Sequence, residues 1–364
     1  MKKIQKATKP ATTLAVETRI ERVCVDLAKS TFHVVGIDRD RKTVFRKKFT
    51  RAAFLDWLTN LPEKVIVAME ACAGSQWWGQ KCQELGHTPM LIPPHRVKPY
   101  ALNQKNDYND AEAIGEASRN SKTFCVPVKT SDQQDLATLL AARQGLLGER
   151  IALTNRIRAF LLERGLPAPK GVASFRNALA AILSEENVGL TLTLKTCLLS
   201  LQTHWQGIER RIFEIEQQMN SLTRQNASSP HLNSVPGIGP LTVAALLALI
   251  GDPRRFENGR AMAAYLGLVV RQNTSGDKIR LGHITKRGDV TLRTLLIHGA
   301  RAALRSLELS PKGIIGDGRF RKWCEALLAR KSHRNVAVVA IANKLVRILW
   351  AVWTKEVPYN PAHA

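Results

Sequence analysis

The sequence predicts an α/β domain at the N-terminus that is followed by mostly helical regions. Between residues 22 and 128, short β-branched runs such as RVCVDLA, FHVVGID and KVIVAME alternate with segments of helical periodicity, as in a mixed α/β sheet. From about Ser131 the strand-like runs give way to long segments with apolar residues at three-four spacing, which indicate helices. A linker, ASSPHLNS, then leads to a last region that opens with an Ala/Leu-rich helix.

These changes in character predict five segments. They are a disordered basic arm, an α/β domain, a helical linker, a mostly helical C-terminal domain and a tail, at residues 1–19, 20–130, 131–227, 228–355 and 356–364.

The order of elements in the N-terminal domain predicts the topology of its sheet. Three strands come first; helix, strand, helix, strand and helix follow, before a last short apolar segment, FCVPV. Strands joined by short turns pair antiparallel, whereas strands joined through a helix run parallel. We therefore expect a mixed sheet with helices on its faces, in which the first and fourth strands are neighbours.

Residues 131–227 predict long amphipathic helices in a coiled-coil-like arrangement, with the loop LPAPKGVASF (166–175) between them. The simplest interpretation is a helical linker without chemistry. The alternative is a nucleic-acid groove lined by arginines of this region, namely Arg143, Arg150, Arg156 and Arg158.

The charge of the chain favours a nucleic-acid partner. Its 364 residues hold 54 Lys and Arg against 30 Asp and Glu, a formal net charge of +24. A phosphate backbone neutralises such an excess and releases condensed counterions on binding. The rival partner is an anionic membrane surface.

The apolar segments do not predict a membrane anchor. The N-terminus lacks the apolar core of a signal peptide, and the stretch from Leu241 to Gly251 is too short to span a bilayer. The stretch from Asn335 to Trp353 carries Lys344 and Arg347 in its middle, which favours an amphipathic core helix. The six cysteines form no CxxC or Cys/His cluster, so we expect reduced, buried thiols, no structural zinc and a cytoplasmic location.

Four acidic residues fall where the predicted elements would bring them together. Asp26 ends the strand RVCVD, and Glu70 ends the strand KVIVAME. A charge at the end of a buried strand needs a partner, and Mg²⁺ binds carboxylate oxygens and bridges oxygens of a phosphodiester. Asp107 and Asp110 lie one turn apart at the start of a helix and would close the cluster. Singly, each residue is explained by a turn, a helix cap or the helix dipole, but together they favour a metal site.

The segment VPGIGP predicts a contact with a phosphate backbone. Gly237 and Gly239 flank one apolar residue just before a helix, and such a hairpin points backbone N–H groups and a helix N-terminus outward. The segment resembles the helix-hairpin-helix motif of DNA-binding proteins. The same residues also serve as an ordinary helix-starting turn.

A second candidate segment surrounds Ser275 and Gly276. The glycine permits close approach of a backbone. The cations that would hold a phosphate near this pair are Arg271, Lys278, Arg280, Lys286, Arg287 and Arg293. A serine hydroxyl is a weak nucleophile unless a base or a metal activates it. Composition by itself therefore favours a basic phosphate-binding loop over a nucleophile.

The strand order and the set Asp26, Glu70, Asp107 and Asp110 resemble the RuvC-like, RNase H-type domain of the DEDD insertion-sequence transposases. The C-terminal half resembles the partner domain of that family, the transposase-20 domain. The matching segments there are VPGIGPLTVAALLALIGDPRRF, AMAAYLGLVVRQNTSGDKIRLGHITKRGD and LRTLLIHGARAAL. Both halves match in order, so the resemblance covers roughly residues 20 to 310.

This resemblance implies a DNA recombinase that uses a serine and a metal. Ser275 matches the serine that attacks a DNA phosphodiester in the family and forms a transient phosphoserine link, while the four carboxylates hold Mg²⁺, or Mn²⁺ in its place. The family also implies a structured non-coding guide RNA that pairs with donor and target DNA. It further implies a homodimer or homotetramer in which the site is assembled between subunits.

The chain departs from many relatives near both parts of the site. Asp277 and His283 stand where glycines are common, and Tyr108 and Asn109 stand where a basic residue is usual. Two other interpretations stay open. One is a metal-dependent nuclease that resembles a junction resolvase, in which water attacks and Ser275 only binds phosphate. The other is a non-catalytic nucleic-acid-binding protein.

Overall fold

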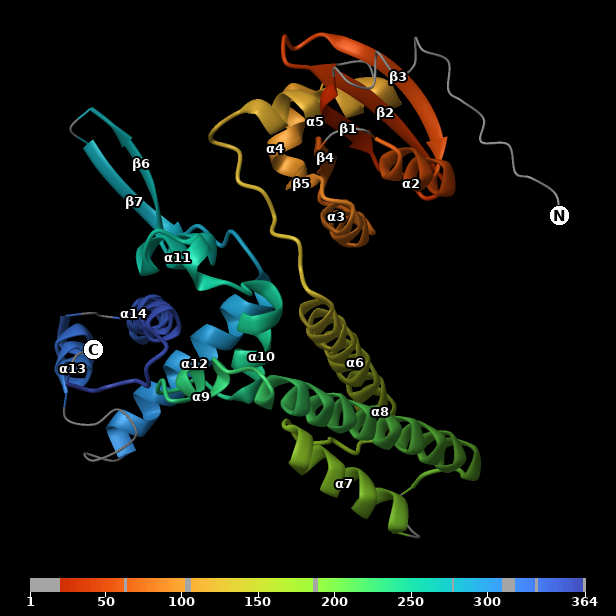
Figure 1. Ribbon diagram of the computed structural model, residues 1–364. Coiled ribbons are helices and arrows are strands. Elements are labelled where there is room, and N and C mark those ends of the chain that lie inside the picture. The colour runs from red at the N-terminus through yellow and green to blue at the C-terminus, as the bar shows by residue number, and fades with distance from the viewer. Residues whose placement is uncertain are drawn as a thin grey trace. The chain divides into compact units, whose positions relative to one another are not determined.

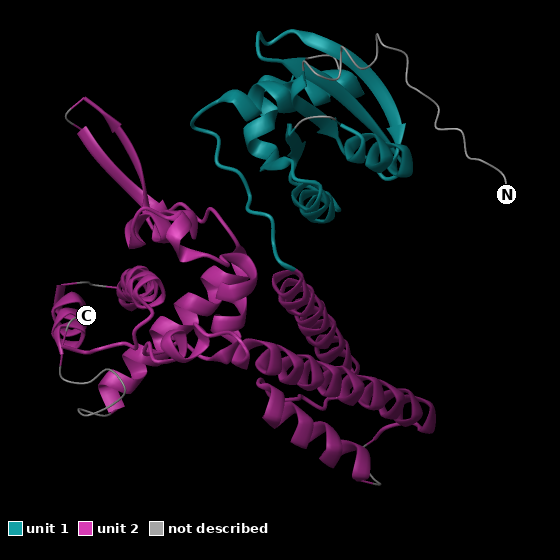
Figure 2. Ribbon diagram, in the orientation of Figure 1, with its two compact units in different colours: residues 1–130 teal, residues 131–364 magenta. Residues whose placement is uncertain are grey.

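The computed structural model describes residues 20–61, 64–101, 106–185, 189–276, 278–309, 318–330 and 333–362. The chain forms two compact units, residues 1–130 and residues 131–364 (Figure 2). The predicted basic arm, the last two residues of the tail and Asp277 lie outside the described residues. The further division of residues 131–364 into a linker, a C-terminal domain and a tail stays a prediction.

A mixed sheet forms the centre of the first unit (Figure 1). Its strands are β1 Ile20–Asp26, β2 Thr31–Asp38, β3 Thr43–Thr50, β4 Ile66–Glu70 and β5 Thr88–Ile92. Their order is β3-β2-β1-β4-β5, with antiparallel pairing among β1, β2 and β3 and parallel pairing from β1 to β4 and from β4 to β5. The predicted mixed sheet and the neighbouring first and fourth strands are confirmed.

Helices cover both faces of this sheet. They are α2 Arg51–Thr59, α3 Ser75–Glu84, α4 Pro94–Val97 and α5 Asp107–Arg119, with the 3-10 turn η1 Lys98–Tyr100. Because successive strand residues face opposite sides, β1 is buried on both faces. Val23 packs in one cluster with Phe54 of α2 and Trp78 of α3. Cys24 packs on the other side with Ala111 of α5.

Long helices begin the second unit, as the periodicity predicts. They are α6 Ser131–Leu162, α7 Val172–Ser184 and α8 Leu192–Arg224. Ion pairs join α6 to α8, with Arg143 Nε 2.7 Å from Glu216 Oε1 and Arg150 Nη1 2.6 Å from Glu209 Oε1. These two arginines are engaged between helices. The predicted loop at residues 166–175 is too long, because α7 begins at Val172 and buries its first turn against α8.

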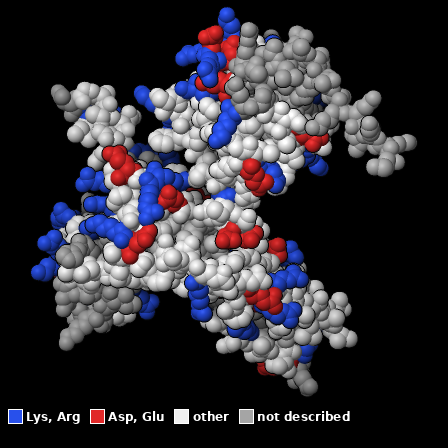
Figure 3. Space-filling view, in the orientation of Figure 1, with Lys and Arg blue, Asp and Glu red and all other residues white. Residues whose placement is uncertain are grey.

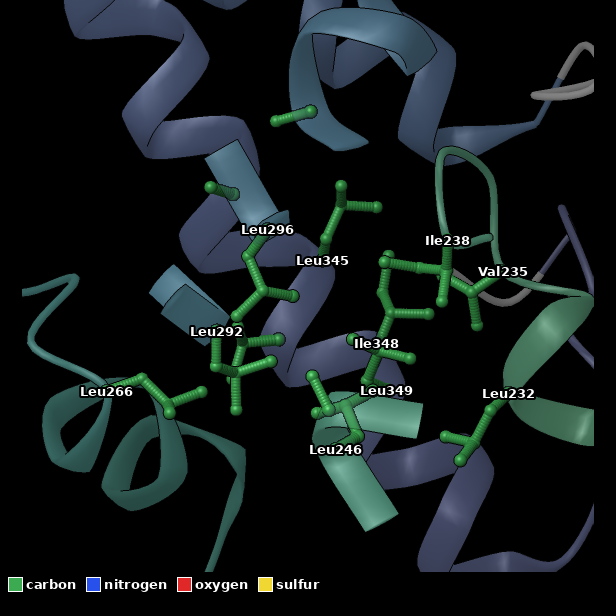
Figure 4. Close-up of a cluster of buried hydrophobic side chains, with 14 of the residues drawn as sticks. Leu232, Val235, Ile238, Leu246, Leu266, Leu292, Leu296, Leu345, Ile348 and Leu349 are labelled. Carbon is green, nitrogen blue, oxygen red and sulfur yellow. The ribbon is translucent and has the colours of Figure 1, made fainter. Parts of the chain in front are cut away.

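The rest of this unit is a helical core that carries a two-stranded ribbon (Figure 1). Its elements are α9 Ser229–Asn233, α10 Pro240–Leu249, η2 Pro253–Arg255, α11 Gly259–Tyr265, β6 Val270–Ser275, β7 Lys278–Ile284, α12 Val290–Leu309, α13 Arg319–Arg330 and α14 Arg334–Lys355. Leu246, Leu296 and Leu345, from α10, α12 and α14, meet in one buried cluster (Figure 4). Leu136 of α6 and Met219 of α8 join the same cluster, so one end of α6 and one end of α8 are anchored in the core.

Helix α14 contains the apolar stretch that the sequence predicts as a core helix. Among the described helices it alone is long and apolar enough to cross a membrane. Its side chains Leu345 and Leu349 are fully buried in the core of the unit, which confirms the core-helix prediction.

The expectation of buried cysteines is partly wrong, because Cys72, Cys125 and Cys197 are exposed.

Candidate active site

Two strand ends bring the first pair of carboxylates together. Asp26 is the last residue of β1 and Glu70 is the last residue of β4. The two strands are parallel neighbours, and Val25 is the register partner of Met69, so the next residue of each strand lies at the same sheet edge. The pKa of the Glu70 carboxyl is raised by partial burial and by the negative charges of Asp26 and Asp110. These three carboxylates therefore share one electrostatic neighbourhood.

Helix α5 supplies the second pair. Asp107 and Asp110 lie in its first turn, while Asn106 is the N-cap and its side chain accepts a hydrogen bond from the Tyr108 backbone N–H. The capping role that could have explained Asp107 therefore belongs to Asn106. Gly115 lets the helix lie close to β1 and β2, since a Cβ there would meet the Ile37 and Cys24 side chains at 2.8 and 3.0 Å.

A histidine that the sequence analysis does not identify also belongs to this cluster. His33 of β2 is the antiparallel register partner of Asp26. Its Nδ1 lies 3.3 Å from Asp107 Oδ2, and one ligand atom each of Asp26, His33 and Asp107 lie within 4.8 Å of one another. Nδ1 is buried and has no hydrogen-bond partner in the part of the chain that the structure describes, because the approach to Asp107 lacks hydrogen-bond geometry. The Tyr108 ring packs edge-on against the imidazole.

This donor set fits a divalent cation. Carboxylate oxygens are hard ligands that suit Mg²⁺ and Mn²⁺, and imidazole nitrogen suits many transition metals. Without a cation the carboxylates repel one another, and the charges of Asp26 and Asp110 add to the larger effect of burial in raising the pKa of Glu70. A cation at this sheet edge would offset that repulsion. The residues that could hold it are Asp26, Glu70, Asp107 and Asp110, with His33 beside them.

Ser275 lies in the second unit, at the tip of the ribbon of β6 and β7. Ser275 pairs with Lys278 at the end of the ladder, and Gly276 turns the chain with a φ of 56°, in the left-handed region that favours glycine. The sequence predicts a loop here, whereas the structure has two paired strands that extend from the helical core (Figure 1). The side chains of both strands are exposed apart from half-buried Ile284. Ser275 is therefore open to solvent.

The predicted phosphate-binding cations divide into two groups. Arg271, Lys278 and Arg280 are exposed on the ribbon, and Lys286 and Arg287 are exposed just after it. Arg293 differs because its side chain is buried in α12. It donates a hydrogen bond to the Arg287 carbonyl at 2.8 Å, so it fixes the base of the ribbon and is not placed among the exposed cations.

Two family models match the chain. A model of the DEDD transposases of IS110 elements, described as Transposase, matches residues 23–164, and one described as Transposase IS116/IS110/IS902 family matches residues 229–312. The chain is 42% identical to a probable family 20 transposase of Pseudomonas aeruginosa, over 94% of this chain and 99% of that protein. It belongs to the IS110/IS116 family of insertion-sequence transposases. Two further relatives are the transposases for IS1111A of Coxiella burnetii and for IS1328 of Yersinia enterocolitica. Each is 38% identical over 92% of this chain, and the matches cover 90% and 97% of those proteins.

Membership makes this chain a DNA transposase, and its DEDD domain suggests dependence on a divalent metal. The matched N-terminal segment, residues 23–164, contains all four carboxylates. The matched C-terminal segment, residues 229–312, contains Ser275. Both parts of the candidate site therefore fall inside the regions that the transposase shares with its family.

The VPGIGP segment of the transposase joins α9 to α10. Gly237 has a φ of 77°, and a Cβ there would meet the Gly299 carbonyl oxygen of α12 at 2.1 Å. Gly239 is the N-cap of α10. Only glycine lets the turn pack this tightly on α12, so the first glycine has a structural role whether or not a phosphate binds. The helix-hairpin-helix function of the segment stays a prediction.

Replacing Glu70 by glutamine should stabilise the metal-free transposase. Folding raises the pKa of the Glu70 carboxyl, so the protonated carboxyl is favoured in the folded protein and the ionised carboxylate destabilises it. The favourable contribution of Glu70 to folding is complete below the unfolded pKa of about 4.3 and is lost as the pH rises through the folded pKa. Glu70→Gln is therefore expected to melt above wild type in EDTA at pH 7, with the difference closing near pH 4. Added Mg²⁺ should raise the melting temperature of wild type more than that of Glu70→Gln.

Thermal melting of both proteins with and without metal checks this result. Glu112→Gln is the matched control, because Glu112 lies on α5 but pairs with Arg46 of β3. A Glu70→Gln protein that melts below wild type in EDTA at both pH values would contradict the repulsive cluster.

Proposed function

We propose that this transposase cleaves and rejoins the DNA of its insertion element through a covalent serine–DNA intermediate, with Mg²⁺ held by Asp26, Glu70, Asp107 and Asp110. Mn²⁺ would serve in its place. The observation that carries the proposal is the juxtaposition of Asp26 and Glu70 on parallel neighbouring strands, with the first turn of α5 beside them. The β3-β2-β1-β4-β5 order supports a RuvC-like, RNase H-type assignment of this domain.

Each part of the site has a role in this reaction. The Ser275 Oγ forms a bond to the scissile phosphorus as the bond from phosphorus to the departing DNA oxygen breaks; the serine proton passes to water, and the departing oxygen takes up a proton from water. A metal held by Asp26, Glu70, Asp107 and Asp110 would supply positive charge that stabilises the negative charge of the reacting phosphate. Exposed Arg271, Lys278 and Arg280 would hold the phosphates of the same strand. A DNA hydroxyl reverses the step, so the phosphoserine link keeps the phosphodiester energy for rejoining.

The exposed ribbon supports assembly of the site from more than one subunit. A two-stranded ribbon is marginally stable in water, and this one exposes the apolar side chains of Val270, Ile279 and Leu281. Such a ribbon gains stability when a partner covers it. We infer a homodimer or homotetramer in which the ribbon of one subunit brings Ser275 to carboxylates of another.

The partners follow from the family resemblance and from charge. DNA is the substrate of a transposase, and we infer that a structured non-coding guide RNA pairs with donor and target DNA. The net charge of +24 suits a protein that holds many phosphates while base pairing specifies the sequence. We place the protein in the bacterial cytoplasm, without a membrane anchor.

The proposal is tested by a search for the covalent intermediate. Full-length protein, element-end DNA and the flanking non-coding RNA are incubated with Mg²⁺, with Mn²⁺ or with EDTA, and a denaturation-resistant protein–DNA adduct is measured. We expect the adduct with either metal and none in EDTA. Efficient cleavage that never yields an adduct would favour attack by water, as in a junction resolvase. Binding without cleavage under all conditions would favour a non-catalytic role.

A further inference from the structure

A cavity of about 590 Å³ lies at one side of the C-terminal helices. The start of α11, one face of α14 and the segment Val357–Asn360 line it. The first turn of α11 lies directly on α14, since a Cβ at Gly259 would meet the Arg347 Cα at 2.9 Å. Among the described residues, the cavity shares no lining residue with the ribbon or with the carboxylate cluster.

The cavity is lined by four cations, Arg260, Lys344, Arg347 and Lys355. Three of them lie on α14 at helical spacing, with Ile348 and Ala351 between them, so they project from one face of that helix. No carboxylate is among the lining residues that the structure describes. Figure 3 shows Lys and Arg side chains gathered over the side of this unit that carries α11, α13 and α14.

These cations are held close together without a compensating anion. None of the four forms an ion pair in the described parts of the chain, whereas nearby Arg254 pairs with Glu356 at 2.6 Å. Lys344 and Arg347 are half-buried. The pKa of Lys344 is lowered by burial and by the charge of Arg347. Gathering like charges in a partly desolvated place costs free energy, and a bound anion would offset this cost.

Tyr359 is one of the residues that line the cavity. Its backbone N–H donates to Ser234 Oγ at 2.7 Å, which fixes the end of the chain beside α14. Its hydroxyl is buried and has no hydrogen-bond partner among the described residues. Burial and the Cys324 thiol raise the pKa of Tyr359 to about 12, so the phenol keeps its proton at neutral pH. The described lining has amide acceptors but no anionic one, and a phosphate oxygen would supply it.

We propose that this cavity binds phosphate groups of a nucleic-acid strand. The volume exceeds that of one phosphate, and the side chains of Ile348, Ala351 and Trp350 give it apolar walls that a sugar or base can contact. Arg260 and Lys355 are exposed at the rim, which lets a strand continue beyond the cavity. This inference does not depend on Ser275 or on the metal site.

The salt dependence of binding tests the proposal. The affinities of full-length wild type and of Arg347→Gln/Lys355→Gln are measured by fluorescence anisotropy on mixed-sequence duplex DNA and single-stranded RNA between 50 and 300 mM KCl. Each phosphate contact contributes about 0.7 to 0.9 to the slope of log affinity against log salt, so the slope of the double variant should be smaller by about 1.4 to 1.8. If the double variant lowers the salt slope on only one of the two nucleic acids, the cavity is assigned to that nucleic acid.

A matched control removes two charges that already have carboxylate partners. Arg254→Gln/Arg334→Gln changes the net charge equally, but these arginines pair with Glu356 and Glu308. Its slope should stay near that of wild type. Circular dichroism checks folding, and Arg260→Gln, at an exposed position, gives a second variant with an expected loss of about 1 if the double variant is unstable.

An acidic membrane surface is the rival ligand. Vesicles of phosphatidylcholine with phosphatidylserine are therefore sedimented with wild type and the same variants. The proposal is overturned if the variant and the control have equal slopes on both nucleic acids. It is also overturned if the substitutions weaken vesicle binding and leave nucleic-acid binding intact.

Discussion

The Asp26→Asn substitution is expected to lower cleavage of element-end DNA by at least about a thousandfold, while the affinity for that DNA stays within about twofold of wild type. Asparagine keeps the size of the side chain at the end of β1 but removes a negative charge that would hold the metal. We expect DNA binding to rely on cations elsewhere in the chain and not on this carboxylate. Cleavage rate and affinity are measured on the same preparation.

The controls separate loss of the metal from general damage. Asp110→Asn should behave like Asp26→Asn, since both charges act on Glu70. Glu112→Gln, on the same helix as Asp110, should cleave normally because Glu112 pairs with Arg46. Mn²⁺ binding, followed by electron paramagnetic resonance, gives a readout that does not need cleavage. If Asp26→Asn keeps both Mn²⁺ binding and cleavage, the metal-site assignment is wrong.

The carboxylate cluster could be predicted from sequence because it depends on simple rules of sheet pairing. Three strands with short turns, followed by strands joined through helices, place β1 beside β4, and the ends of parallel neighbours share one edge. Asp26 and Glu70 end those strands, so their proximity follows from the topology. The only further requirement for the cluster is that the first turn of α5 lies near that edge.

His33 was missed because its position depends on register, which short turns do not define from sequence alone. A shift of one residue between β1 and β2 would turn His33 to the opposite face of the sheet. The observed register pairs it with Asp26. A histidine within a strand is more often explained by packing, so composition gave no reason to select it. The usable signal was its position seven residues after Asp26, across a tight hairpin.

The ribbon of β6 and β7 was missed for a different reason. Its sequence is rich in charge and small residues, which predicts a loop, and neither face is buried, so no apolar alternation marks the strands. Pairing across the Gly276 turn creates the two strands.

The sequence also could not distinguish exposed Arg287 from buried Arg293. The burial of Arg293 depends on the Arg287 carbonyl, which is in place only once the segment after the ribbon has folded.

The Ser275→Ala substitution is expected to abolish the denaturation-resistant protein–DNA adduct and to lower strand exchange by at least about a thousandfold. Alanine removes the hydroxyl oxygen that would form the phosphoserine link, and it does so at an exposed position where no packing is lost. The ribbon should therefore stay paired, and metal binding by the other unit should not change. Adduct formation is measured by denaturing gel electrophoresis with labelled DNA, and Mn²⁺ binding is measured in parallel.

Thr274→Ala provides the matched control, because Thr274 carries a hydroxyl one residue away on the same strand and is equally exposed. It should keep the adduct, although it loses the hydrogen bond that Gln272 donates to Thr274 Oγ1. Loss of the adduct in both variants would indicate that the ribbon tip as a whole is required and that Ser275 has no special role. An adduct that persists in Ser275→Ala requires another nucleophile, and cleavage without an adduct in wild type requires water. In either case the carboxylates could still act with a metal, so the two halves of the proposed mechanism are separable by experiment.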